Sequence, residues 1–140
     1  PFFDWLISDL LPSLETELNV GQDPDARILA GHSYGGLATV WAFYHAHDFW
    51  GHFAPISPSL WWDLAVPFTY EAETPPFPAQ IHLNIGSVEG IPMNSLFDEY
   101  VRRLQQRPEI SVSSHIFEGY DHYSVIHVAF ADVFSSLENP

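Results

Sequence analysis

The sequence has no cysteine, no lysine and little positive charge of any kind. Without cysteine the chain forms no disulfide and holds no cysteine-ligated zinc or iron–sulfur site. Apart from histidine, its basic residues are four arginines, set against 18 aspartates and glutamates, which gives a formal net charge of −14. Nucleic acids and anionic lipid headgroups attract proteins through lysine and arginine. The sequence therefore predicts neither a nucleic-acid partner nor a membrane partner.

The sequence also lacks the apolar run of about 18 residues that a membrane-spanning helix needs. Its first residues, Pro1–Trp5, have neither an initiator methionine nor the design of a signal peptide. This leaves the compartment unassigned, with the cytoplasm slightly favoured. Apolar residues make up 46% and aromatic residues 16% of the 140 positions, so we expect a folded core rather than a disordered chain.

Helical and strand-like spacings of apolar residues alternate along the chain. Helices are predicted over residues 2–18, 35–47, 94–106 and 125–137, and strands over residues 27–30, 53–57, 81–85 and 110–117. Pro12 is expected to kink or divide the first helix. The proline-rich stretch 57–79 is expected to be a loop with one short helix near Leu60–Leu64. Strands that alternate with helices indicate an α/β fold with a mostly parallel sheet of about four strands, flanked by helices.

The most informative motif is Gly31-His32-Ser33-Tyr34-Gly35, which fits G-x-S-x-G between a short apolar strand and a helix. This context is the one that a nucleophile elbow requires, because the tight turn exposes the serine hydroxyl at the carboxyl end of the sheet. We expect Gly31 and Gly35 to leave room where a side chain would strike a neighbouring element. The Tyr34 N–H, at the start of the helix, is predicted to stabilise an oxyanion. The alternative is a glycine-rich turn with an uninvolved serine.

A serine nucleophile needs a base, and the base needs an acid that orients it. In this type of site both follow the serine, with the histidine last. Three histidines lie late enough, and His122 is favoured because it falls in a loop after the last predicted strand. His115 lies within that strand and His127 within the last helix.

The acid is predicted at Glu89, in the turn that follows the strand 81–85. Asp98 and Glu99 are less suitable because they fall in the next helix. Asp121 adjoins His122, and neighbouring residues rarely orient each other well. The alternative for Glu89 is a loop carboxylate in water.

Two clusters of titratable residues and one pair of tryptophans have competing interpretations. The histidines are interpreted as a solvated helix end rather than a metal site, and the arginines as cations in the last turns of a helix rather than an anion site. No metal or cofactor is therefore predicted. The tryptophans are predicted either to line an apolar substrate pocket or to pack in the core. These residues are His45, His47 and His52, then Arg102, Arg103 and Arg107, and finally Trp61 and Trp62.

Four segments, in this order, resemble one branch of the α/β-hydrolases. They are Gly31–Leu37 around the elbow, the string Ile56–Trp62 (Ile-Ser-Pro-Ser-Leu-Trp-Trp), Gly86–Glu89, and His122–Val125. Together they are similar to the branch of esterases that includes the enterochelin (ferric-siderophore) esterases, with relatives of feruloyl esterase and S-formylglutathione hydrolase. The similarity covers nearly the whole chain, from Phe2 to Leu137.

The resemblance implies Ser33 as nucleophile, His122 as base and an ester or thioester as substrate. It places Glu89 at the acid position, although siderophore esterases often work with a Ser–His pair. In this fold about four strands precede the nucleophile strand, and a loop among them supplies a second oxyanion donor. We therefore expect residues 1–140 to be the C-terminal portion of one α/β-hydrolase domain. Without those strands, the nucleophile strand would form an apolar edge open to self-association.

The expected function is that of a serine esterase that cleaves a small-molecule carboxylic ester through an acyl-enzyme. One alternative is a non-catalytic fragment or pseudoenzyme that acts by binding, since the portion 1–140 alone could be inactive. The other is an acyltransferase that uses the same three residues. The identity of the ester is not predicted.

Overall fold

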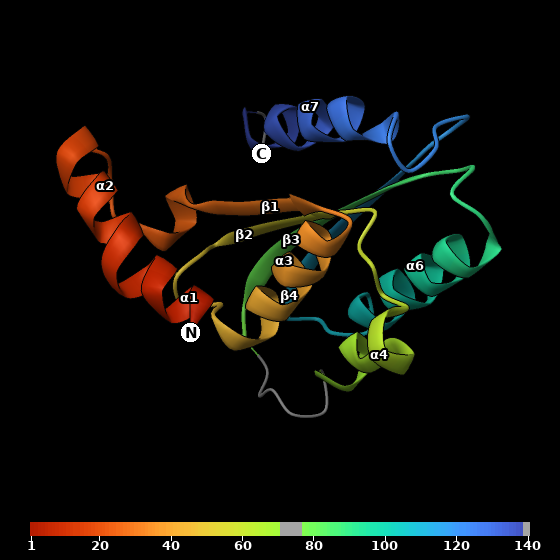
Figure 1. Cartoon of the computed structure of the whole chain (residues 1–140), viewed down its shortest axis with the longest axis horizontal. Coiled ribbons are helices and arrows are strands. Elements are labelled where there is room, and N and C mark those ends of the chain that lie inside the picture. The colour runs from red at the N-terminus through yellow and green to blue at the C-terminus, as the bar shows by residue number, and fades with distance from the viewer. Residues whose placement is uncertain (71–76, 139–140) are drawn as a thin grey trace.

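The computed structural model describes residues 1–70 and 77–138, with side chains through residue 136. Its sheet has four strands in the order β1-β2-β3-β4, and each neighbouring pair is parallel (Figure 1). The strands are β1 (Ile28–His32), β2 (His52–Ile56), β3 (Ala79–Gly86) and β4 (Ile110–Phe117). The predicted α/β class and parallel sheet are therefore confirmed, and the strand boundaries lie within two residues of those predicted.

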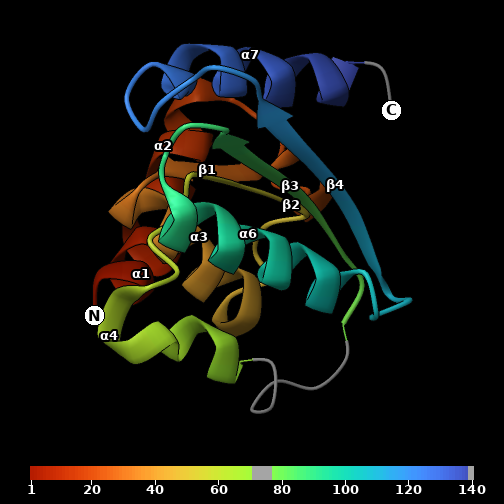
Figure 2. The ribbon, with the colours of Figure 1, turned by 90° about the vertical axis from the view of Figure 1, so that its right-hand side faces the viewer.

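Helices cover both faces of the sheet. Figures 1 and 2 show α3 (Tyr34–His45) and α6 (Ile91–Leu104) on one face and α7 (Val125–Glu138) on the other. Parallel strands need such crossover helices, because each strand must start from the same end of the sheet. All four strands therefore end at one edge, and the loops that follow them meet there.

The N-terminal segment passes Pro12 without a break. It consists of α1 (Phe2–Trp5), a π-helical turn (Leu6–Leu10) and α2 (Leu11–Leu18). Proline has no N–H and its ring clashes with the carbonyl four residues earlier. The wider π-helical turn lies directly before Pro12, and such turns accommodate local disruptions of the helical ladder. The expected kink or division thus takes the form of a π-helical turn that separates α1 from α2, while the backbone stays helical through Pro12. The segment ends at Asn19, which has a left-handed backbone.

The apolar core lies between the sheet and the helices α3 and α6. Phe43 of α3 contacts Phe53 of β2 edge to face, with ring centroids 5.3 Å apart. Both side chains are fully buried, as are Leu83 of β3 and Leu104 of α6. Buried aromatic pairs of this kind add to the stability that their buried area provides.

The sheet face beneath α7 is more polar. Alternation along the strands turns His52, His82 and Ser113 to this side, and the His82 ring nitrogen Nδ1 lies 2.8 Å from Ser113 Oγ. The His52 and His82 rings stack with centroids 6.0 Å apart. The apolar contact of α7 centres on Ile56, on which Val125 and Ala129 pack, with partly buried apolar side chains around them.

Strands β1 and β4 form the two edges of this sheet. The strand β1 is partly exposed along its whole length, although its apolar run is typical of a buried strand. Self-association through this edge stays a prediction. Short segments join the larger elements, namely the turns η2 (Pro24–Ala26) and η3 (Val66–Thr69) and the turn α4 (Trp62–Ala65). A short helix was predicted at about this place, but in α4 the backbone of Asp63, Leu64 and Ala65 is left-handed.

Candidate active site

Ser33 occupies the turn between β1 and α3, at the edge where the strands end. Its φ of +59° lies in a region that residues other than glycine rarely adopt. Backbone hydrogen bonds hold the turn: the Ser33 N–H donates to Ile56 O at 3.0 Å, and Ser33 O accepts from the N–H groups of Leu37 at 2.9 Å and Ser59 at 3.2 Å. This strained strand-to-helix turn has the form predicted for a nucleophile elbow.

The glycines around Ser33 differ in how closely a neighbouring element approaches them. A Cβ on Gly31 would lie 2.3 Å from the Gly35 carbonyl oxygen, so the predicted need for glycine holds there. A Cβ on Gly35 would meet nothing within 4 Å, so the predicted need is wrong at that position. The second close approach is at Gly36, where a Cβ would lie 2.9 Å from Ile56 O and from Pro58 Cα. The helix α3 thus packs on the end of β2 through Gly36.

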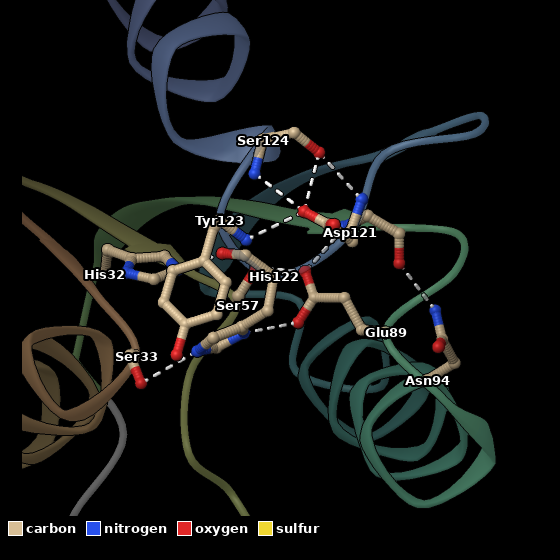
Figure 3. Close-up of polar contacts among 10 residues, drawn as sticks. His32, Ser33, Ser57, Glu89, Asn94, Asp121, His122, Tyr123 and Ser124 are labelled. Carbon is tan, nitrogen blue, oxygen red and sulfur yellow. Dashed lines mark hydrogen bonds and ion pairs between the residues drawn. The ribbon is translucent and has the colours of Figure 1, made fainter.

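The structure joins Ser33, His122 and Glu89 in one hydrogen-bonded chain (Figure 3). His122 Nδ1 lies 2.7 Å from Glu89 Oε2, and His122 Nε2 lies 2.9 Å from Ser33 Oγ. A carboxylate can only accept, so Nδ1 carries the proton and Nε2 is free to accept from the serine hydroxyl. The three residues come from three different loops, separated by up to 89 positions in the sequence.

The other candidates for base and acid make contacts elsewhere. His115 pairs with Asp132 at 3.2 Å on the exposed side of β4, and His127 contacts the ring of Tyr120. Glu99 pairs with two arginines of its own helix. Asp121 holds the loop of His122 but does not contact the imidazole through a hydrogen bond in the described structure. Of the candidates discussed, the geometry thus brings His122 and Glu89 together with Ser33, and their catalytic roles stay predictions.

Glu89 is buried, with no exposed side-chain surface. Its Oε1 accepts from the Ser57 hydroxyl at 2.5 Å and from the Gly86 N–H at 2.9 Å, while Oε2 faces His122. A buried carboxylate is costly unless it is hydrogen-bonded, and here both oxygens have donors. Sequence reasoning gave Ser57 no role of its own, although it was the last residue of a predicted strand and part of the string Ile56–Trp62 that carries the family resemblance.

The turn of Glu89 and the loop of His122 are tied together by their backbones. The Ser87 N–H donates to Phe117 O at 3.0 Å, and the Val88 N–H donates to Tyr120 O at 3.1 Å. The approach is close enough that a Cβ on Gly86 would lie 2.2 Å from Tyr120 O. The distance between Glu89 and His122 is thus set by the pairing of β3 with β4.

Two further residues fix the loop of His122. The Asp121 carboxylate accepts from the N–H groups of Ser124 and Tyr123 and from the Ser124 hydroxyl. These hydrogen bonds, above all those from Ser124, lower the pKa of Asp121. From the other side, His32 Nε2 lies 2.7 Å from the carbonyl oxygen of His122. Sequence reasoning missed His32, although it directly precedes Ser33 in the motif.

The predicted oxyanion donor, the Tyr34 N–H, lies at the start of α3. Tyr34 is the first residue of this helix, so its N–H has no acceptor within the helix. The helix dipole adds partial positive charge at the same end. The role of the Tyr34 N–H as an oxyanion donor stays a prediction that this position suits.

A small open cavity of about 160 Å³ lies over the hydrogen-bonded chain. Trp61 is part of its wall, and the Trp61 ring lies edge to face with Tyr34 at 6.0 Å. Trp62, in contrast, is not among the described residues that line this cavity. Substrate contact by the two tryptophans stays a prediction, and the structure favours Trp61 for it. The lining residues are Ser33, Ser59, Trp61, Glu89, Met93 and His122.

The remaining candidate clusters lie apart from this cavity. His45 contacts Trp41, and the His47 ring stacks on Phe77 at 3.9 Å. In the part of the chain that the structure describes, no group of three or more histidine or acidic side chains could hold a metal ion. None of the described helices is both long enough and apolar enough to traverse a lipid bilayer.

Arg102 and Arg103 lie in the last turn of α6, as predicted, whereas Arg107 lies beyond the helix end at Leu104. All four arginines also pair with carboxylates. Arg102 and Arg103 pair with Glu99, Arg107 pairs with Glu109, and Arg27 pairs with the nearly buried Glu15. The arginines thus form ion pairs within the fold, and none of them is among the described residues that line the cavity.

A sequence model of one family, described as "Putative esterase", matches residues 2–127. The chain belongs to this family. Among curated relatives, the uncharacterized protein YbbA of Bacillus subtilis is 27% identical over 101 residues, which are 72% of this chain and 40% of YbbA. The iron(III) enterobactin esterase of Dickeya dadantii is 37% identical over 60 residues, which are 41% of this chain and 14% of that protein.

Solved structures share the fold of this esterase-family chain. The siderophore hydrolase EstA of Aspergillus nidulans superposes with a TM-score of 0.88 at 22% identity, covering 99% of this chain and 56% of EstA. The BES protein of Bacillus cereus gives a TM-score of 0.83 at 24% identity, covering 94% of this chain and 51% of that protein. The chain thus spans about half the length of these structures and less of the curated relatives.

Proposed function

We propose that this chain carries the catalytic residues of a serine carboxylic ester hydrolase. The single observation that carries the proposal is the hydrogen-bonded chain from Ser33 Oγ through His122 to the buried Glu89. Such an arrangement activates a hydroxyl that is otherwise a weak nucleophile. Membership of the esterase family and the likeness to proteins named as enterobactin esterase and siderophore hydrolase support an ester as substrate.

In the first half of the reaction, Ser33 Oγ attacks the carbonyl carbon of the ester and its proton passes to His122 Nε2. The carbonyl oxygen becomes an oxyanion, and the proposed donor to it is the Tyr34 N–H. The tetrahedral intermediate collapses as its bond to the alcohol oxygen breaks, and His122 returns the proton to that oxygen. An alcohol leaves, and the acyl group stays on Ser33.

In the second half, a water molecule attacks the acyl carbon while His122 Nε2 takes its proton. The bond to Ser33 Oγ then breaks, the proton returns to that oxygen, and a carboxylic acid leaves. In both halves Glu89 keeps Nδ1 of His122 protonated and stabilises the imidazolium that forms. No step requires a metal or cofactor.

The test is reaction of the purified protein with a fluorophosphonate probe and with p-nitrophenyl acetate. Ser33→Ala is expected to abolish labelling and to lower kcat by at least about 10⁴-fold, because the nucleophile is lost. Ser13→Ala is a matched control, since Ser13 is exposed on α2 and its hydroxyl donates to Asp9 O in the same helical segment. Labelling or hydrolysis that persists in Ser33→Ala would contradict the proposed function.

A further inference from the structure

Ser57 contacts the acid of the site but not its cavity. The side chain follows β2 directly, is fully buried, and donates from Oγ to Glu89 Oε1 at 2.5 Å. The same oxygen accepts from the Gly86 N–H, so Oε1 has two donors and only Oε2 remains for His122. Two fixed donors on one oxygen prevent the carboxylate from rotating.

The position of Ser57 is itself fixed by the sheet. The Ser57 N–H donates to Asn84 O at 2.7 Å, which continues the pairing of β2 with β3 beyond the end of β2. The φ of Ser57 is +44°, in the left-handed region that costs free energy for any residue other than glycine. With this backbone conformation, the Ser57 hydroxyl points toward Glu89, in the turn that follows β3.

The donors that hold Glu89 are neutral, apart from the charge that His122 acquires in the reaction. The four arginines of the chain pair with three other carboxylates, namely Glu15, Glu99 and Glu109. Among the described residues, Ser57 is thus the one side chain besides His122 that donates to Glu89. A buried carboxylate that loses such a donor must either move or stay incompletely hydrogen-bonded.

We propose that Ser57 is a positioning residue that holds Glu89 Oε2 toward His122 Nδ1. This inference rests on the proposed function, because it assigns Ser57 a part in the same reaction. The imidazolium of His122 exists in the transition states, so a misplaced carboxylate slows the chemical steps. Since Ser57 is not among the described residues lining the cavity, its loss leaves the binding of substrate unchanged.

The first test removes the hydroxyl in two ways. Ser57→Ala keeps a Cβ, whereas Ser57→Gly fits the left-handed backbone without one and guards against a folding defect. Both are expected to lower kcat for p-nitrophenyl acetate by about 10- to 100-fold, with KM changed by less than about twofold. Tyr100→Phe is the control, because it removes another buried hydroxyl, from α6, and should leave kcat unchanged. Wild-type kcat in both Ser57 variants would overturn the inference.

The second test is a double-mutant cycle with Glu89→Ala. If Ser57 acts through Glu89, Ser57→Ala should change kcat by less than about twofold once the carboxylate is absent. An equal fractional loss in the presence and absence of Glu89 would show a general structural role and overturn the inference.

The two proposals fail in distinguishable ways. Activity that survives Ser33→Ala contradicts the proposed function whatever the Ser57 variants do. If Ser33→Ala is inactive while both Ser57 variants keep wild-type kcat, only the role of Ser57 is contradicted.

Discussion

The side chain of His32 is joined to the backbone of His122 across 90 positions of the sequence. His32 Nε2 lies 2.7 Å from the His122 carbonyl oxygen, and the two imidazole rings lie 4.5 Å apart between centroids. A carbonyl only accepts, so Nε2 of His32 carries the proton. The residue before the proposed nucleophile thus holds the loop of the proposed base.

The first prediction concerns the contact between His32 Nε2 and the carbonyl oxygen of His122. His32→Phe keeps an aromatic ring beside His122 but removes the N–H, which leaves the carbonyl without this donor. We expect a loss of about 1–2 kcal/mol in transition-state stabilisation, or about tenfold in kcat. His32→Gln, which can reach with an N–H of its own, should recover part of the loss. Equal kcat in all three proteins, measured with p-nitrophenyl acetate, would contradict this role.

The second prediction concerns two adjacent glycines of α3. Gly36→Ala should destabilise the fold by about 1–3 kcal/mol, because its Cβ would press on Ile56 O and Pro58 Cα. Gly35→Ala should be neutral or stabilise the fold by up to about 1 kcal/mol, because its Cβ meets open space and alanine favours a helix. Urea unfolding of the two variants measures the difference. The prediction is wrong if the two free energies of unfolding change alike.

The third prediction is a dependence of stability on pH that involves His82. Burial, and secondarily the neighbouring His52, lowers the pKa of His82 in the folded state. As the pH falls below about 6.5, His82 therefore binds a proton in the unfolded chain before it does so in the folded protein. The contribution of His82 to the free energy of unfolding is therefore fully present above that pH, and it is lost as the pH falls toward the lower pKa of the folded state. Burial also lowers the pKa of His32, which acts in the same direction.

His82→Asn removes the titrating group while it can keep a hydrogen bond to Ser113. The urea midpoint of this variant should fall less steeply than that of the wild type between about pH 6.5 and 5. Below about pH 4.5 both should lose stability together, because hydrogen bonds lower the pKa values of Glu15, Glu99, Glu109 and Asp121 in the folded state. Identical slopes above pH 5 would count against the assignment to His82.

The fourth prediction separates the two tryptophans. Trp61→Ala should raise KM for p-nitrophenyl acetate about fivefold, as expected for the loss of about 1 kcal/mol of aromatic contact. Trp62→Ala is the matched control and should change KM much less, since the described cavity is lined by Trp61 alone of the pair. Vinyl acetate, which has no ring, should show a smaller effect of Trp61→Ala. A larger effect of Trp62→Ala than of Trp61→Ala would reverse the assignment.

The sequence by itself determined the elements and the order of the functional motifs. Period-2 and period-3.6 spacing depends on neighbours in the chain, so the strands and the helices α3, α6 and α7 could be predicted to within a few residues. The elbow around Ser33 is also local, because a tight turn and the helix that follows it depend on nearby residues. An error arose at Gly35, where the motif alone does not show whether a side chain would meet a neighbouring element.

The tertiary structure alone decided which side chains meet. Sequence reasoning left three histidines and four carboxylates as candidates. The order of the four parallel strands brings His122 and Glu89 to Ser33, whereas His115 faces Asp132. The contacts of Ser57 with Glu89 and of His32 with His122 join residues 32 and 90 positions apart. The spacing of apolar residues in the sequence cannot predict such contacts, because they depend on strand register and on the backbone conformation at the ends of the strands.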